Sequence, residues 1–156
     1  GSEMCIRDRC MIRLLVRGLP AWTLSIVCCL IILYLTLLPD PLNGNHVSLF
    51  EGADKVVHAI MMMGMMMCMA VDALRKKAAH RLDDSVRAPK GLLTVYMITV
   101  VLFGGAIELL QGAMAMGRGE DWADFMADAA GAVIGWIICL SAWSVTVRWL
   151  FREQQE

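Results

Sequence analysis

The chain has 156 residues, of which 58% are hydrophobic, and its net charge is −1. The apolar content exceeds the roughly 45–50% of a typical soluble domain, and a mean hydropathy of +0.61 agrees with a membrane protein. Because the net charge is close to zero, the composition gives no signal for nucleic-acid binding, and we expect no nucleic-acid partner.

The first ten residues, GSEMCIRDRC, differ in character from the rest of the chain and resemble a translated adaptor or assembly scar. We therefore expect residues 1–10 to be a non-native leader and leave them out of the fold prediction. The remainder is predicted to form a single domain over residues 11–152, followed by a tail at 153–156. The six cysteines contain no C-x-x-C pair, so they predict neither a zinc site nor a disulfide framework.

Four apolar segments are candidates for membrane-spanning helices, which need about 20 largely apolar residues each. In chain order they cover about residues 20–38, 56–74, 92–115 and 122–149. Pro and Asn-Gly after the first segment indicate a turn. The charge-dense stretch 75–91 is predicted to be a solvated loop, and 117–124 is a short connection. The predicted fold is therefore all-α, a polytopic bundle of four transmembrane helices.

Basic residues are distributed unevenly around these four segments. All but two of the fourteen Lys and Arg residues lie in the N-terminal segment, in the middle loop or at the C-terminal end. Four crossings place these three regions on one side, and the positive-inside rule makes that side cytoplasmic. The exceptions, Lys55 and Arg118, lie in the connections on the other side. We expect a multi-pass protein of the cytoplasmic membrane with both termini cytoplasmic.

Polar residues gather at the outer ends of the predicted helices. The predicted ligand-binding residues are Asp54, Lys55, His58, Glu108, Gln111, Arg118, Asp124 and Asp128. An ionisable residue inside a membrane span is a functional-site candidate with a nearby partner. Asp72, near the other end, is interpreted as part of the charged loop. The alternative is a polar cluster whose only role is to fix the register of the helices.

Helical spacing places these residues on shared faces, because positions three and four apart are neighbours on a helix. One face of the third segment carries Gly104, Glu108 and Gln111, and one face of the fourth carries Asp124 and Asp128 followed by two glycines. These are Gly131 and Gly135, a G-x-x-x-G pattern that lets another helix approach closely. We predict that Gly104, Gly131 and Gly135 are helix-packing positions and that the polar faces enclose an outward-facing pocket.

Three blocks of sequence resemble the VanZ-like membrane proteins. They are DKVVH at 54–58, GGAIELLQ at 104–111 and RGEDWADFMADAAGAVIG at 118–135. The chain departs from the family pattern at Met62, where Tyr is common, and at Asp128, where Asn is common. The resemblance implies a small integral membrane protein of the bacterial cell envelope, in the inner membrane, from a family named for an association with resistance to the glycopeptide antibiotic teicoplanin. It implies no particular reaction.

Three functions are compatible with the sequence. The leading hypothesis is a pocket that binds a polar ligand such as a lipid head group or a cell-wall precursor, with membrane lipids as partners. The second is an intramembrane enzyme that uses acid–base or metal-assisted chemistry on a lipid-linked substrate, for which His58, Glu108 and Asp124 are the catalytic candidates. The third is an ion- or proton-coupled transporter. Because the chain lacks H-E-x-x-H or a comparable ligand pair, the sequence predicts no metal site and no cofactor.

Overall fold

The structure, a computed structural model, describes residues 19–38, 52–80, 88–114 and 122–151. These residues form four helices and no strands, as predicted: α2 (Thr23–Leu37), α3 (Ala53–His80), α5 (Lys90–Met114) and α6 (Trp122–Phe151). The one clear difference in extent is α3, which continues through residues 75–80 where the sequence predicted a loop. Arg, Lys and Ala fill most of that stretch, and all three are strong helix formers.

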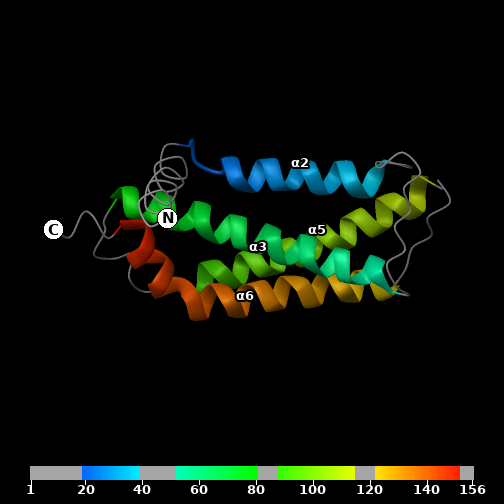
Figure 1. Cartoon of the computed structure of the whole chain (residues 1–156). Helices are drawn as coiled ribbons and strands as arrows, with labels where there is room; N and C mark the ends of the chain where they lie inside the picture. The colour runs from blue at the N-terminus through cyan, green and yellow to red at the C-terminus, as the bar shows by residue number, and fades with distance from the viewer. Residues whose placement is uncertain (1–18, 39–51, 81–87, 115–121, 152–156) are drawn as a thin grey trace, which may run out of the picture.

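The four helices run side by side, and each runs opposite in direction to the one before it (Figure 1). The last turns of α2 and α5 therefore lie at the same end of the bundle as the first turns of α3 and α6; we call this the site end. The most extensive packing is between α3 and α6, followed by α5 against α6, while α2 packs mainly on α3. The bundle thus forms around α3 and α6, with α2 on its outside.

Three of the helices are long and apolar enough to cross a membrane: Ala53–Lys76, Lys90–Met114 and Trp122–Arg148. The first predicted span is the shorter apolar helix α2, with 15 residues. At 1.5 Å per residue it is roughly 22 Å long, against about 30 Å for the hydrocarbon core of a bilayer. The long helices expose large apolar side chains on their outer faces, such as Val95 on α5 at 56%. Such apolar faces are compatible with contact to membrane lipid.

The α3–α6 contact is close because α6 has no side chain at two positions. A Cβ atom on Gly131 would overlap the backbone carbonyl of Ala59 in α3. A Cβ atom on Gly135 would lie 3.0 Å from Met66 Cβ and 3.1 Å from the carbonyl oxygen of Met63. The G-x-x-x-G pattern therefore allows the backbones of α3 and α6 to approach closely, as such patterns do in membrane proteins.

Asp72 corrects the sequence interpretation, because it is 2% exposed and lies inside the bundle rather than in a charged loop. Its Oδ2 accepts hydrogen bonds from the backbone N–H and the hydroxyl of Ser25, at 2.9 and 2.8 Å. The Ser25 N–H is one of the groups that the first turn of a helix leaves without an intrahelical partner. The N-cap residue Trp22 makes no side-chain capping bond. Asp72 thus caps α2 from the neighbouring helix.

Arg75 completes this connection between α2 and α3. Its Nη1 donates to Asp72 Oδ1 at 2.8 Å, and its Nη2 donates to the backbone carbonyls of Leu19 and Pro20. Arg75 was predicted to be a solvated loop residue, and this prediction is wrong because its side chain is only 8% exposed. A buried carboxylate needs a paired charge, and Arg75 supplies it one turn along the same helix. The pair holds the first turn of α2 against the bundle.

Gly131→Ala is expected to lower the free energy of unfolding by about 1–3 kcal/mol, the usual cost of overpacking a close contact. The matched control is Gly64→Ala in α3, where a Cβ atom would meet nothing within 4 Å. That substitution should leave stability unchanged or slightly raised, because Ala is the better helix former. Thermal unfolding of the detergent-purified variants measures both. Equal midpoints for the two variants would contradict the close α3–α6 packing.

Asp72→Asn is expected to destabilise the fold by roughly 3–5 kcal/mol, because it leaves the Arg75 guanidinium buried without its counter-charge. Ser25→Ala removes one hydroxyl but keeps the backbone hydrogen bond, so its expected cost is about 1 kcal/mol. Titration with a denaturing detergent, followed by far-UV circular dichroism, ranks the two. A cost for Asp72→Asn no larger than that for Ser25→Ala would show that Asp72 does not anchor α2.

Candidate functional site at one end of the bundle

The structure brings the predicted site residues to one end of the bundle, where three helices contribute them. Asp54, Lys55 and His58 lie in the first turns of α3. Glu108 and Gln111 lie in the last turns of α5, and Asp124 and Asp128 lie in the first turns of α6. The remaining predicted residue, Arg118, lies outside the described residues. The antiparallel arrangement is the reason these segments, distant in sequence, become neighbours.

The centre of the site is a buried triad of His58, Glu108 and Asp128, one residue from each of these helices. Their exposed fractions are 4%, 6% and 0%. His58 Nδ1 lies 3.1 Å from Asp128 Oδ1 and 3.7 Å from Glu108 Oε1. The first distance is within hydrogen-bond range. His58 therefore links α3 to both α5 and α6 below the surface of the bundle.

Gly104 makes the position of Asp128 possible. A Cβ atom on Gly104 would lie 2.7 Å from Asp128 Oδ2 and 2.9 Å from Asp128 Cβ. Either distance is too short for atoms that are not bonded to each other, so any larger residue here would displace the carboxylate. Gly104, which the sequence predicted to be a packing position, leaves the space that the Asp128 side chain occupies.

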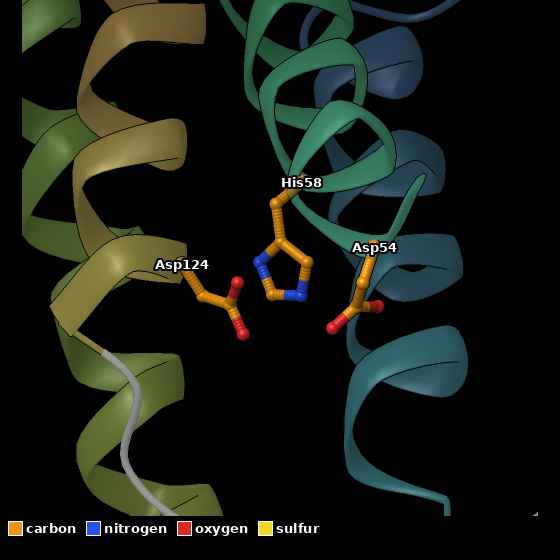
Figure 2. A group of neighbouring side chains, drawn as sticks. All are labelled: Asp54, His58 and Asp124. Carbon is orange, nitrogen blue, oxygen red and sulfur yellow. The ribbon is translucent and has the colours of Figure 1, made fainter. Parts of the chain in front are cut away.

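A second group of charges lies nearer the end of the bundle. Asp54 and Asp124 point toward the His58 ring from two sides (Figure 2). One carboxylate oxygen of each Asp and one ring nitrogen of His58 all lie within 4.8 Å of one another. Lys55 Nζ forms an ion pair with Asp124 Oδ1 at 3.1 Å, with the Lys55 side chain 42% exposed. We call Asp54, His58 and Asp124 the outer group. It shares His58 with the buried triad and differs from it in being partly exposed.

Gln111, one of the predicted ligand-binding residues, hydrogen-bonds to the backbone of another helix. Its side-chain Nε2 donates a 2.8 Å hydrogen bond to the backbone carbonyl of Thr36, near the end of α2. This carbonyl belongs to the last turn of α2, where backbone acceptors lack helical partners. Gln111 thus joins α5 to α2 at the site end, as Asp72 joins α3 to α2 at the other end.

An apolar groove of about 400 Å³ lies between α5 and α6 beside the triad. Among the described residues its walls are almost entirely apolar, and Glu108 is the one charged residue that lines it. The lining residues are Val101, Leu102, Gly105, Ala106, Glu108, Leu109, Trp122 and Phe125. Glu108 therefore belongs both to the triad and to the wall of the groove. The sequence did not predict this groove; the signal that could have indicated it is the pair of small residues, Gly105 and Ala106, directly after Gly104.

Double-mutant cycles should separate the inner contact from the outer one. Removing His58 and Asp128 singly and together is expected to give a coupling energy of about 1–3 kcal/mol, because both groups are buried and in contact. The same cycle for Lys55 and Asp124 is expected to give below about 1 kcal/mol, because a partly exposed ion pair contributes little. Unfolding free energies in detergent supply both values. A larger coupling for Lys55 and Asp124 would contradict this ordering.

One of three comparisons with known proteins finds a match. The model of the VanZ/LLP1 family matches residues 25–144, a range that contains all three site-bearing segments. A search of curated proteins and a search of solved structures find no match. The matched range covers most of the 156 residues, and it includes the triad, the outer group and the groove. The chain belongs to the VanZ/LLP1 family.

Proposed function

We propose that this protein binds an amphipathic ligand at the site end, with the polar head at the outer group and the hydrocarbon chain in the groove. The ligand class is a membrane lipid or a lipid-linked cell-wall precursor. The single observation that carries the proposal is the position of Glu108, which borders the buried triad on one side and the apolar groove on the other. A ligand that used both surfaces would have to be polar at one end and apolar at the other.

The groove has the properties of a small-molecule site. Its volume of about 400 Å³ falls within the roughly 300–1,000 Å³ usual for ligand pockets. Trp122 and Phe125 form one part of its wall, with their rings in an edge-to-face contact at 5.9 Å between centroids. Aromatic and aliphatic walls with a single charged residue suit a hydrocarbon chain that ends in a polar group.

The outer group supplies contacts for the polar head. Lys55 is partly exposed next to Asp124, so an anionic oxygen can approach its ammonium group. His58 lies between two carboxylates of the same group and can donate or accept a hydrogen bond. Arg118 remains a predicted contributor to this contact. A phosphate-bearing head group matches these donors, because Lys and Arg are the residues that bind phosphate oxygens.

The orientation extends the proposal to the outer face of a bacterial cytoplasmic membrane. The positive-inside rule assigns the basic segments, with both termini, to the cytoplasm, which makes the site end the outer end. This orientation requires α2, the shorter apolar helix, to cross the membrane as well. The opposite directions of α2 and α3 are consistent with such a crossing (Figure 1). Cell-wall precursors are exposed at that face, which is also where a link to glycopeptide resistance would act.

An acid–base enzyme is the second candidate, and the buried His58–Asp128 contact at 3.1 Å favours it. A carboxylate that orients an imidazole is a common arrangement for general acid–base catalysis. A transporter is less well supported. Between His58 and Asp72 on α3 lie Met62 and Met66, which are both 0% exposed, and this apolar layer interrupts any polar path between the two ends of the described bundle.

Ala106→Trp is expected to fill the groove and to reduce co-purified lipid at least severalfold. The matched control is Ile98→Trp on the same helix, at a position that is 50% exposed but does not line the groove. Glu108→Gln and Lys55→Ala test the polar end and should change which head-group classes are retained. Quantitative lipid mass spectrometry of protein extracted from native membranes measures these effects. Identical lipid profiles for the wild type, Ala106→Trp and Glu108→Gln would contradict the proposal.

A further inference from the structure

The buried triad concentrates negative charge where water does not reach. Glu108 and Asp128 are 6% and 0% exposed, and both approach the same nitrogen of His58. Two ionised carboxylates this close in a buried site repel each other, and the interior offers little solvation to offset this. Such a pair is stable when a proton or a cation lies between the oxygens. The triad therefore has the charge of a cation site.

The distances within the triad suit ligands of a single metal ion. One nitrogen and two carboxylate oxygens lie within 4.8 Å of one another, with N–O separations of 3.1 and 3.7 Å. Ligand atoms about 2.0–2.2 Å from a tetrahedral metal ion are roughly 3.4 Å apart, which falls between these two values. Because α3, α5 and α6 contribute one ligand each, no short sequence motif could have indicated the site.

Asp128 provides a second, independent observation. Its Oδ2 is fully buried and has no hydrogen-bond partner among the described residues. Buried carboxylate oxygens are normally satisfied by a donor or an ion. Gly104 leaves open the space in which this oxygen lies. Both oxygens of Asp128 therefore lie in the protein interior, and Oδ1 is the one that hydrogen-bonds to His58.

We propose that His58, Glu108 and Asp128 bind one divalent transition-metal ion, Zn²⁺ or Mn²⁺. Imidazole nitrogen suits Zn²⁺ and carboxylate oxygen suits Mn²⁺, so a set of one nitrogen and two oxygens is compatible with either ion. Two carboxylates balance the charge of the ion. The outer group is the weaker site, because Lys55 already pairs with Asp124. The metal site requires only these three side chains, so this proposal does not depend on lipid binding.

The test is metal titration of the full chain, purified in detergent with its affinity tag removed and stripped with a chelator. After dialysis against Zn²⁺ or Mn²⁺ alone, elemental analysis should find about one ion per chain. Asp128→Asn and His58→Ala should weaken binding by more than roughly tenfold, because even loss of a residue that only orients a metal ligand costs about 10–100-fold in affinity. Asp54→Asn, in the outer group, is the matched control and should retain the wild-type affinity. X-ray absorption at the zinc edge should show nitrogen and oxygen ligands and no sulfur.

Several results would overturn the proposal. These are no bound metal in the wild type, unchanged affinity in Asp128→Asn, an equal loss in Asp54→Asn, or sulfur ligands, which would indicate binding by cysteine. Size-exclusion profiles and circular dichroism establish that each variant is folded, and Glu108→Gln replaces any variant that is not. The titration contains no added lipid, so a failure of the lipid-binding proposal leaves the metal result unchanged.

Discussion

The close approach of α3 and α6 is the constraint on which the rest of the structure depends. It exists because Gly131 and Gly135 present no side chain to the backbone of α3. Gly131 lies against Ala59, the residue next to His58, and one turn before Gly131 on α6 lies Asp128. The helix contact therefore sets the 3.1 Å distance between His58 and Asp128. Gly104 then allows α5 to approach the same carboxylate, which brings Glu108 to the triad.

The buried face of α3 is polar at both ends and apolar between them. His58 at the site end and Asp72 at the other end are separated by Met62 and Met66, and all four are almost fully buried. The two polar ends have different roles. Asp72 has hydrogen bonds from Ser25 and Arg75 that hold α2 in place. The triad instead adjoins the apolar groove between α5 and α6.

Local patterns in the amino-acid sequence are enough to predict an all-α fold and the candidate site residues. Long apolar runs require helices in a bilayer, since only helices satisfy every backbone group locally, and this predicted the described helices with small errors at their ends. Spacing of three and four residues placed Glu108, Asp128 and the glycines on inward faces. These inferences depend on local periodicity, which neighbouring segments do not change. The match to the VanZ/LLP1 family over residues 25–144 confirms the resemblance.

Which of these residues contact one another depends on the packing of the helices and could not be read from the sequence. Asp72 looked like a loop charge because its partner Ser25 lies 47 positions earlier in the chain. Gln111 turned out to contact α2 through the Thr36 carbonyl, and the groove arises from small residues on α5 that face aromatic ones on α6. Side-chain partners, cavities and ligand sets of this kind depend on how helices are rotated and spaced. Those quantities are set by packing across the whole bundle, which no single segment encodes.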